Sequence, residues 1–378
     1  MITNMIVLSI ETSCDDTAIS IIKAKSSKKL DYANFEVLSD LTASQIEIHR
    51  PYGGVFPAVA KREHQRTLIP LLIKSLKKAN LLKESKTIDN KKISKIKKNL
   101  EKNEELFLQL KEFLTKYQIK DINKIAVTIG PGLEPCLYTG INLAKSLSYY
   151  YNIPLVGVNH LEGHILSSFL SPHEDLELPA IALIVSGGNT QLIYFEKIGK
   201  YKIIGETKDD AAGECFDKTA RILGLNYPGG PEISKKAREC KSNIYNITLP
   251  RPMINDKNYD FSFSGLKTAV LYHSKKNKIT DDYIKEMSLE IESSIVDVLV
   301  DKTLRAIDEY KAKSLLLGGG VSANQKLIKE FKKKTKIKLF IPNKKYTGDN
   351  ASMIGLVSIY SPNIKKIIKP ISNLKINE

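Results

Sequence analysis

The sequence lacks long apolar runs and has few cysteines. No stretch stays apolar for the ~18 residues that a membrane-spanning helix needs, and residues 1–10 contain no basic segment typical of a signal peptide. We therefore expect neither export nor a membrane partner. In a chain too long to depend on disulfides, four widely spaced cysteines without a Cys-x-x-Cys pair predict a reducing compartment, the cytoplasm. These cysteines are Cys14, Cys136, Cys215 and Cys240.

Length and charge set broad limits on the organisation of the chain. With 378 residues, 42% of them apolar, it is longer than a single core usually accommodates, so two domains are expected. The 58 basic and 42 acidic residues give a net charge of +16. This excess favours a polyanionic partner such as nucleic acid, although lysines that only coat a solvated surface would give the same charge.

Two segments of similar design each predict a strand, a polar turn and a second strand. The strand pairs are residues 5–10 with 18–22, and residues 180–185 with 191–195. Further buried strands are expected at 124–129, 155–158 and 314–317, with a helix at 140–151 and another that begins near Ser322 or Ala323. This alternation predicts an α/β protein, and the repeated hairpin predicts two similar domains.

A lysine-rich segment interrupts this pattern between residues 83 and 120. Residues 83–102 contain eight lysines, yet the apolar residues keep a nearly helical spacing. They are Ile93, Ile96, Leu100, Phe107, Leu110 and Leu114. We expect an inserted amphipathic helical arm, which either touches RNA or is a solvated surface insertion.

His160 and His164 have the spacing that brings two side chains onto one face of a helix, about 6 Å apart. Two imidazoles in that position can share a metal ion, although such a pair can also pack without metal. Asp349 is a plausible third ligand. The pattern differs from the His-Glu-x-x-His of zinc proteases, because Glu162 is misplaced and Gly163 weakens the helix.

Three turns have the composition of anion-binding loops, because glycines let backbone amides approach a phosphate and hydroxyls add donors. They span residues 11–17, 186–190 and 318–324. None is a Walker loop or a dinucleotide fingerprint, and each alone can be an ordinary glycine turn. All three in this order favour a nucleotide site.

A further polar segment contains Asp209, Asp210 and Asp217. Its carboxylates suit ribose hydroxyls or a metal ion, but Asp209 and Asp210 can equally complement the dipole at a helix N-terminus. Asp217 lies beside Lys218 inside the expected helix, where a simple surface ion pair is the alternative.

Taken together, seven motifs resemble one family, the tRNA adenosine threonylcarbamoyltransferases, once described as O-sialoglycoprotein endopeptidases. The resemblance covers nearly the whole chain outside about 83–120. The motifs are residues 9–17 (Ser-Ile-Glu-Thr-Ser-Cys-Asp-Asp-Thr), 49–64 with Tyr-Gly-Gly-Val-Phe-Pro at 52–57, 130–133 (Gly-Pro-Gly-Leu), 159–164 (Asn-His-Leu-Glu-Gly-His), 185–190 (Val-Ser-Gly-Gly-Asn-Thr), 260–267 (Asp-Phe-Ser-Phe-Ser-Gly-Leu-Lys) and 318–324 (Gly-Gly-Gly-Val-Ser-Ala-Asn).

This resemblance implies the fold of the actin, sugar-kinase and heat-shock ATPase superfamily, an actin-like ATPase fold with two similar domains around a nucleotide cleft. We expect residues 1–179 to form the N-terminal actin-like domain, which residues 345–378 complete and which carries the insertion at about 83–120. Residues 180–344 would form the second domain.

The resemblance also implies roles for individual residues. His160, His164 and Asp349 would hold one divalent metal ion per subunit, iron or zinc, and Asp15 matches a carboxylate that the family needs for activity. Contacts to the substrate adenylate would come from Ile184, Val185, Ser186, Gly187, Gly188, Asp217, Gly230 and Asn324. Asn189 departs from the histidine of many bacterial members, so we assign it no ligand role.

The implied activity is transfer of a threonylcarbamoyl group from threonylcarbamoyl-AMP to N6 of the adenosine next to the anticodon, in tRNAs that read codons starting with A. Implied partners are tRNA and, as in many bacteria, a paralogous non-catalytic subunit and a small ATPase, although organellar members act alone.

Three other functions remain as alternatives. An actin-fold small-molecule kinase is disfavoured by the histidine pair, since kinases hold magnesium with carboxylates and water. The second is a nucleotide-gated scaffold or chaperone. A protease is the least favoured, because Glu162 does not supply a suitably placed base.

Overall fold

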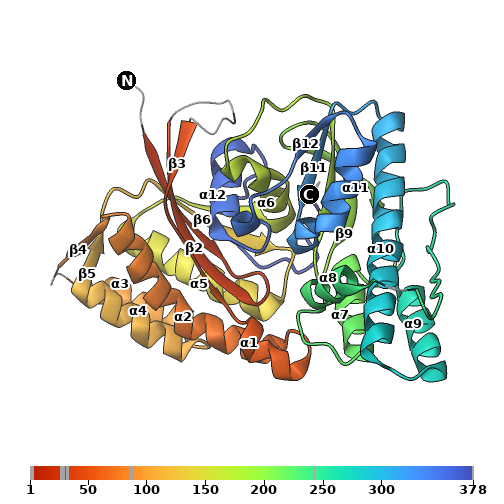
Figure 1. Cartoon of the computed structure of the whole chain (residues 1–378). Helices are drawn as coiled ribbons and strands as arrows, with labels where there is room; N and C mark the ends of the chain where they lie inside the picture. Colours follow the sequence, from red (N-terminus) through yellow and green to blue (C-terminus); the bar gives the residue numbers. More distant parts are fainter. Residues whose placement is uncertain (1–3, 26–29, 31–33, 86–87, 242, 377–378) are drawn as a thin grey trace.

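The computed structural model describes residues 4–25, 30, 34–85, 88–241 and 243–376 (Figure 1). Within them the chain forms two five-stranded sheets of the same design and one two-stranded sheet. The strand orders are β3-β2-β1-β6-β7 and β10-β9-β8-β11-β12. The expected α/β architecture with two similar halves is therefore confirmed.

The first sheet contains the predicted N-terminal hairpin. Strand β1 pairs antiparallel with β2, from Met5 with Ala24 to Glu11 with Ala18, and parallel with β6. The strands are β1 (Met5–Glu11), β2 (Asp16–Ala24), β3 (Phe35–Ser44), β6 (Lys124–Gly130) and β7 (Leu155–Asn159). The turn between β1 and β2 therefore opens at the same edge as the carboxyl ends of the parallel strands, where ligands bind in open α/β sheets.

The second sheet repeats this pattern with a second hairpin. Strand β8 pairs antiparallel with β9 and parallel with β11, and every residue of β8 is buried. The strands are β8 (Ala180–Val185), β9 (Thr190–Lys197), β10 (Lys200–Glu206), β11 (Ser314–Gly318) and β12 (Lys338–Phe340). The predicted strands at 180–185, 191–195 and 314–317 are confirmed.

Helices cover the outer faces of both sheets (Figure 1). The helices α2 (Pro57–Lys78) and α5 (Glu134–Tyr151) pack on the first sheet. On the second side lie α7 (Ala212–Ile222), α8 (Gly229–Glu239), α9 (Ser264–Lys276), α10 (Asp281–Glu309) and α11 (Gln325–Lys334). The last of these begins later than expected, at Gln325, because Gly320–Ala323 form a 3-10 turn and the Asn324 side chain caps the helix.

Two further helices lie between the sheets (Figure 1). They are α6 (His160–Leu166) and α12 (Ala351–Tyr360), whose buried residues share one hydrophobic cluster with strands of both sheets. Helix α12 also contacts β1, β2 and β3, so the end of the chain returns to the first sheet. This packing supports our proposal that residues 345–378 belong with residues 1–179, and that 180–344 form the second domain.

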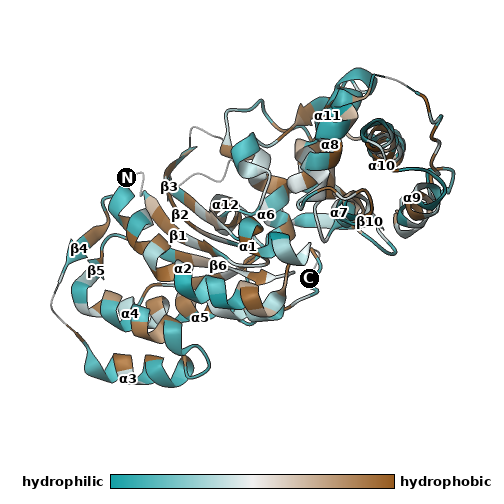
Figure 2. Ribbon diagram, turned by 60° about the horizontal axis from the view of Figure 1, so that its bottom comes forward, coloured by the Kyte–Doolittle hydropathy of each residue, from teal (hydrophilic) through white to brown (hydrophobic). Residues whose placement is uncertain are grey.

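The lysine-rich segment forms helices α3 (Asn90–Asn99) and α4 (Glu104–Lys116) between the paired strands β4 (Leu82–Glu84) and β5 (Tyr117–Ile119). Figure 2 shows both helices at the outer edge of the molecule, beside α2 and α5. Their apolar residues are buried in the core of the first half, including Ile96 and Leu110. The amphipathic helices are confirmed, and they pack as part of the domain.

The remaining short elements are α1 (Ile46–His49) and the 3-10 turns η2 (Arg50–Tyr52), η3 (Ser167–Leu170), η4 (Gly320–Ala323) and η5 (Lys344–Tyr346). In the described part of the chain, no helix has both the length and the apolar character needed to cross a membrane.

We predict that Leu110→Ala destabilises the protein by about 2–5 kcal/mol, because the side chain is fully buried beneath α2 and the substitution leaves a cavity. Leu108→Ala, on the same helix but 58% exposed, is the matched control and should change the free energy of unfolding little. Urea unfolding measures both. Equal effects would show that α4 does not belong to the core.

Candidate metal centre and substrate cleft

The two histidines of the site lie at the start of α6, immediately after β7. The Asn159 side chain caps this helix by accepting a hydrogen bond from the Leu161 backbone amide at 2.9 Å. The spacing of four residues brings the rings of His160 and His164 to a centroid distance of 4.6 Å. Gly163 has a packing role, since a Cβ there would lie 2.9 Å from Met353 Cγ on α12.

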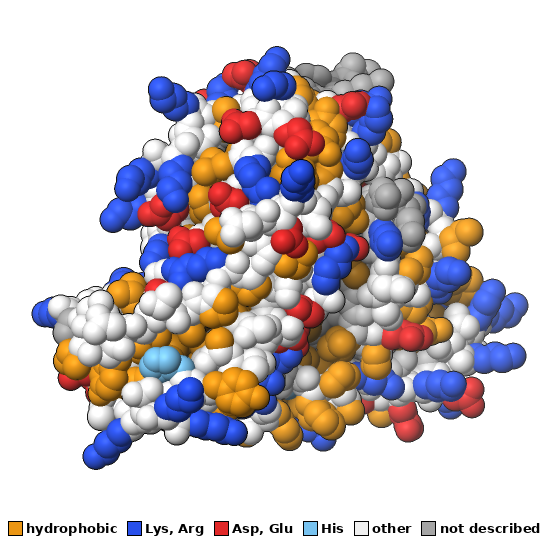
Figure 3. All heavy atoms as spheres, turned by 90° about the vertical axis from the view of Figure 1, so that its right-hand side faces the viewer, with side chains coloured by type: hydrophobic (Ala, Val, Ile, Leu, Met, Phe, Trp, Pro, Cys, Tyr) orange, Lys and Arg blue, Asp and Glu red, His pale blue; other side chains and the backbone are white. Residues whose placement is uncertain are grey.

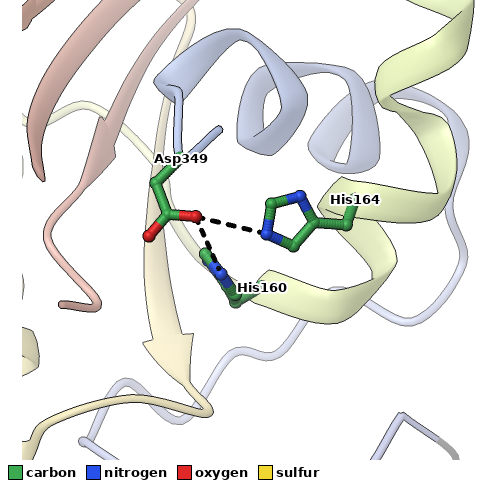
Figure 4. A group of neighbouring side chains, drawn as sticks. All are labelled: His160, His164 and Asp349. Atoms are coloured by element: carbon green, nitrogen blue, oxygen red, sulfur yellow. Dashed lines mark ion pairs between the residues drawn. The ribbon is translucent and has the colours of Figure 1, made fainter. Parts of the chain in front are cut away.

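Asp349 enters the site from the opposite direction, just before α12 (Figure 4). Its Oδ1 lies 3.4 Å from His160 Nε2 and 3.2 Å from His164 Nε2. Asn350 fixes the start of the helix by accepting a hydrogen bond from the Met353 amide at 2.9 Å. The structure thus brings together the three residues that the sequence suggested as metal ligands.

The triad fits a metal ion. One ligand atom from each residue lies within 4.8 Å of the other two, and ligands about 2.1 Å from a shared ion are roughly 3.0–3.4 Å apart. His164 is buried, and apart from the contact of Nε2 with Asp349 neither of its ring nitrogens has a hydrogen-bond partner among the described residues. A buried imidazole with so few polar partners is costly without a ligand. Two nitrogens and one carboxylate suit iron, zinc or manganese.

Glu11, at the end of β1, completes the surroundings of the triad. It is fully buried. Its Oε2 accepts a hydrogen bond from Thr128 Oγ1 at 2.5 Å and lies 3.0 Å from His160 Nδ1. A carboxylate on the second ring nitrogen fixes the imidazole so that Nε2 faces the ion. Sequence reasoning placed Glu11 in a polar turn and missed this role. Its position at the end of a buried strand was the available signal.

The charges of the triad are strongly coupled. Burial lowers the pKa of His160, but the Asp349 and Glu11 carboxylates outweigh it and raise that pKa to about 10. Burial disfavours the ionised form of Asp349, yet the two imidazoles hold its pKa well below the usual range. Burial and the neighbouring His160 lower the pKa of His164. Without metal, the site is therefore an ion pair beside a neutral imidazole.

A cavity of about 750 Å³ is lined by residues between Gly187 and Thr347, none of which belongs to the triad. Its lining includes Thr347, two residues before Asp349. Four of the predicted adenylate-binding residues line it, namely Gly187, Asp217, Gly230 and Asn324. This volume falls within the range of small-molecule sites.

The other predicted contacts lie in or just after β8. Ile184 and Val185 are buried within the strand, whereas Ser186 and Gly188 belong to the turn that follows. The turn packs closely against its neighbours, because a Cβ at Gly213 would lie 2.5 Å from the Ser186 carbonyl oxygen. These four residues are not among those that line the cavity, whereas Gly187 of the same turn is, and a Cβ at Gly187 would meet open space.

Asp217 points into the cavity rather than forming a surface ion pair. Its Oδ1 accepts a hydrogen bond from the Gly229 amide at 2.6 Å, and burial raises its pKa to about 6. Lys218 pairs instead with Asp210 and Glu214. The surface-pair alternative is therefore excluded, and Asp217 Oδ2 remains available to a ligand.

Asp209 and Asn324 hold neighbouring backbone and side chains in place. Asp209 accepts hydrogen bonds from the backbone amides of Phe263 and Ser264. The Asn324 amide nitrogen donates to Glu292 Oε1 at 2.7 Å, and its oxygen caps α11. Asn324 therefore lines the cavity, but both ends of its side-chain amide already hydrogen-bond within the protein.

Comparison with known proteins connects this site to one family. The family model described as tRNA N6-adenosine threonylcarbamoyltransferase matches residues 36–89 and 103–356. Proteins of that name from Bacillus subtilis, Bacillus licheniformis and Bacillus thuringiensis are 42%, 40% and 39% identical over 357 residues. The alignments cover 93% of this chain and 89–90% of theirs. The chain belongs to this family.

Membership of the family makes the protein a tRNA-modifying enzyme that attaches a threonylcarbamoyl group to N6 of adenosine. The kinase, scaffold and protease alternatives are thereby set aside. The family model leaves residues 90–102 unmatched, which include helix α3. Structures of HypF, one of them from T. kodakarensis, align at 14% identity with TM-scores of 0.45 and 0.47, over 69% and 68% of this chain and 43% and 41% of theirs.

In this transferase the first turn, between β1 and β2, faces the metal triad. Ser13 Oγ lies 3.5 Å from Asp349 Oδ2, and the Ser13 carbonyl accepts a hydrogen bond from the Leu133 amide at 2.7 Å. Burial and the nearby Asp349 carboxylate raise the pKa of Asp15 above its ordinary value. The same causes, with Asp15 added, raise the pKa of Asp16 to about 7. Asp15 is thus a half-buried carboxylate within electrostatic reach of Asp349.

Loss of a residue that only hydrogen-bonds a metal ligand lowers metal affinity by roughly 10–100-fold. We predict a loss in this range for Glu11→Gln and a larger loss for His164→Ala, which removes a ligand itself. His173→Ala, outside the triad, is the matched control and should leave affinity unchanged. Titration of the metal-free protein with Zn²⁺ or Fe²⁺ by calorimetry measures all three. Equal affinity in His164→Ala and the wild type would exclude this site.

Metal affinity should also rise with pH. His160 carries a proton below pH about 10, and that proton must leave Nε2 before the nitrogen can bind a metal. Between pH 7 and 9 we therefore expect release of close to one proton per ion, measured as the dependence of binding heat on buffer ionisation enthalpy. Affinity that is independent of pH would contradict the His160–Asp349 ion pair.

Proposed function

We propose that this transferase takes its acyl group from threonylcarbamoyl-AMP and passes it to the adenosine next to the anticodon, in tRNAs that read codons starting with A. The observation that carries the proposal is the cavity of about 750 Å³, which is lined by glycine turns and by Thr347, two residues before the triad residue Asp349. A nucleotide-sized site beside a metal triad suits a donor whose reactive anhydride links an acyl group to a phosphate.

The adenylate would lie in the cavity with its ribose toward Asp217. The free Oδ2 of this residue suits a ribose hydroxyl. Gly187 and Gly230 leave room for close approach of the nucleotide, because a Cβ at the first would meet open space and at the second nothing nearer than 3.9 Å. Ile184, Val185, Ser186 and Gly188 support this part of the site from β8 and its turn, and Asn324 also lines the cavity.

One divalent metal ion, iron or zinc, would be held by His160, His164 and Asp349. It would supply Lewis-acid stabilisation of negative charge on the donor. The chain's own contribution is to hold the triad rigid, through Glu11 on His160 and the cap of Asn350 on α12.

Asp15 would act on the attacking amine. The lone pair of an adenine amino group is delocalised into the ring, so the nucleophile is weak and the donor must be an activated anhydride. In the reaction N6 bonds to the carbamoyl carbon, AMP leaves with the electrons of the broken C–O bond, and N6 loses a proton. A raised pKa suits Asp15 to accept that proton. The base must be unpaired to reach the cleft, as an anticodon-loop nucleotide is.

From its family we infer that the enzyme acts in the cytoplasm, together with a paralogous non-catalytic subunit and a small ATPase. The substrate tRNA follows from membership of the family. These two protein partners rest on the resemblance alone, and their contribution is tested by adding them to the transfer assay.

We predict that Asp15→Asn lowers the rate of transfer by about 10²–10⁴-fold, the usual contribution of a positioned base, and leaves adenylate affinity unchanged. Asp16→Asn is the matched control: it removes the adjacent half-buried carboxyl, which lies at the start of β2, and should retain transfer. Single-turnover transfer to unmodified tRNA measures the rates. In the wild type, the rate should fall as acidification protonates Asp15. Undiminished transfer by Asp15→Asn would remove its catalytic role.

Asp217→Asn should weaken adenylate binding about 10-fold or more, because a hydrogen bond to a charged group contributes roughly 1.5–3 kcal/mol. Asparagine keeps the Oδ1 that accepts from Gly229, so the fold is preserved. Asp308→Asn, exposed on α10 and outside the cavity, is the control. Binding of a non-hydrolysable adenylate analogue should also weaken below pH about 6 in the wild type, as Asp217 becomes protonated. Unchanged affinity would place the ribose elsewhere.

A further inference from the structure

Two aromatic side chains stack on each other in the open, in the segment between β3 and α2. The rings of Tyr52 and Phe56 have centroids 5.6 Å apart and planes inclined by 19°. Tyr52 is 57% exposed and Phe56 is 50% exposed. Burying such rings is favourable, so a paired aromatic surface left open to solvent points to a ligand that covers it.

The aromatic pair is fixed to the rim of the substrate cavity. The Arg50 guanidinium donates through Nε to the carbonyl oxygen of Tyr227, a cavity-lining residue, at 3.2 Å. The Arg221 guanidinium on α7 donates to the carbonyl oxygen of Gly53, whose φ of +63° lies in the left-handed region. These two contacts connect the segment that carries the aromatic pair to the second half of the molecule.

A second set of contacts connects the pair to the turn that holds Asp15. The Phe56 amide donates to His49 Nδ1 at 3.3 Å, and His49 Nε2 lies 3.2 Å from Gln45 Oε1. Gln45 Nε2 lies 3.4 Å from His64 Nδ1, and His64 Nε2 lies 2.9 Å from the carbonyl oxygen of Cys14. The aromatic pair therefore has a defined position relative to Asp15, the residue proposed to act on the adenosine.

Arginines lie close to the pair in the chain, each beside a glutamate. Arg62 and Arg66, on α2, are half exposed or more and pair with Glu63, and Arg50, two residues before Tyr52, pairs with Glu47. The face that carries α9 and α10 also has lysine and arginine side chains interspersed with acidic ones (Figure 3). Aromatic rings beside arginines are the usual means of holding single-stranded RNA.

We propose that Tyr52 and Phe56 form a stacking platform for a base of the tRNA anticodon loop, next to the adenosine that enters the cleft. The proposal rests on the proposed approach of the anticodon loop to this cleft. An adenosine drawn toward Asp15 leaves its neighbours in the loop without a stacking partner on one side. A ring pair at the rim replaces that partner without reading sequence, which suits an enzyme that acts on several tRNAs.

The test is binding of an unmodified anticodon stem-loop RNA to the full-length protein, followed by fluorescence anisotropy. Tyr52→Ala and Phe56→Ala should each weaken binding by about 10-fold, in line with the usual loss of one base–aromatic stack. Tyr52→Phe should bind like the wild type. Tyr272→Ala, which removes a tyrosine exposed to 61% on α9, is the matched control.

Salt and kinetics separate stacking from charge and from folding. The loss in Tyr52→Ala should be the same at low and high salt, whereas Arg62→Ala should reduce the dependence on salt. The KM for tRNA should rise in Tyr52→Ala, while adenylate affinity stays that of the wild type. Wild-type affinity of both alanine variants for the stem-loop would overturn the proposal, as would no measurable binding by the wild type. If the alanine variants bind a protein partner less well but keep their affinity for RNA, the pair belongs to a protein interface instead. Failure of the wild type to modify full-length tRNA would instead count against the proposed reaction.

Discussion

The contact on which the site depends is that of His160 with two carboxylates, one on each ring nitrogen. Glu11 lies 3.0 Å from Nδ1 and Asp349 lies 3.4 Å from Nε2. They come from the end of β1 and the start of α12, so one imidazole ties together the first and last regular elements of the described chain. Because the ring is buried and its charge is held by both partners, neither element can shift without leaving a buried charge unpaired. The triad, the first turn and the adjoining rim of the cavity take their positions from this arrangement.

Much of the fold could be predicted from local sequence. In each case two apolar segments flank a short polar turn. This pattern was enough to predict both hairpins, since the pairing of strands joined by a short turn is set by nearby residues. The spacing of His160 and His164 likewise predicted a shared helix face, and the rings do face each other. Asp349 lies 185 residues beyond His164, so spacing could not supply it; its carboxylate, between a strand and the terminal helix, suggested an oxygen ligand, and the family resemblance implied the same role.

Contacts between distant segments could not be predicted in this way. The pairing of Glu11 with His160 spans 149 residues and depends on how β1 and β7 flank β6 in the sheet. Asn324 was predicted to contact the adenylate, but its amide nitrogen already donates a hydrogen bond to Glu292 on α10. For the lysine-rich segment, composition suggested a solvated arm, but the apolar residues between the lysines pack into the core beside α2 and α5. Tertiary burial outweighs local composition in such cases.

The central claim is that the metal triad and the cavity form one active site for transfer from an adenylate to tRNA. The most direct test is transfer of radiolabelled threonylcarbamoyl from its adenylate to unmodified tRNA by the purified protein, with and without chelator and the candidate partner proteins. We expect label on the adenosine next to the anticodon, abolished by chelator and restored by added iron or zinc. Label that persists after complete removal of metal, or that appears on another nucleotide, would contradict a single active site of this kind.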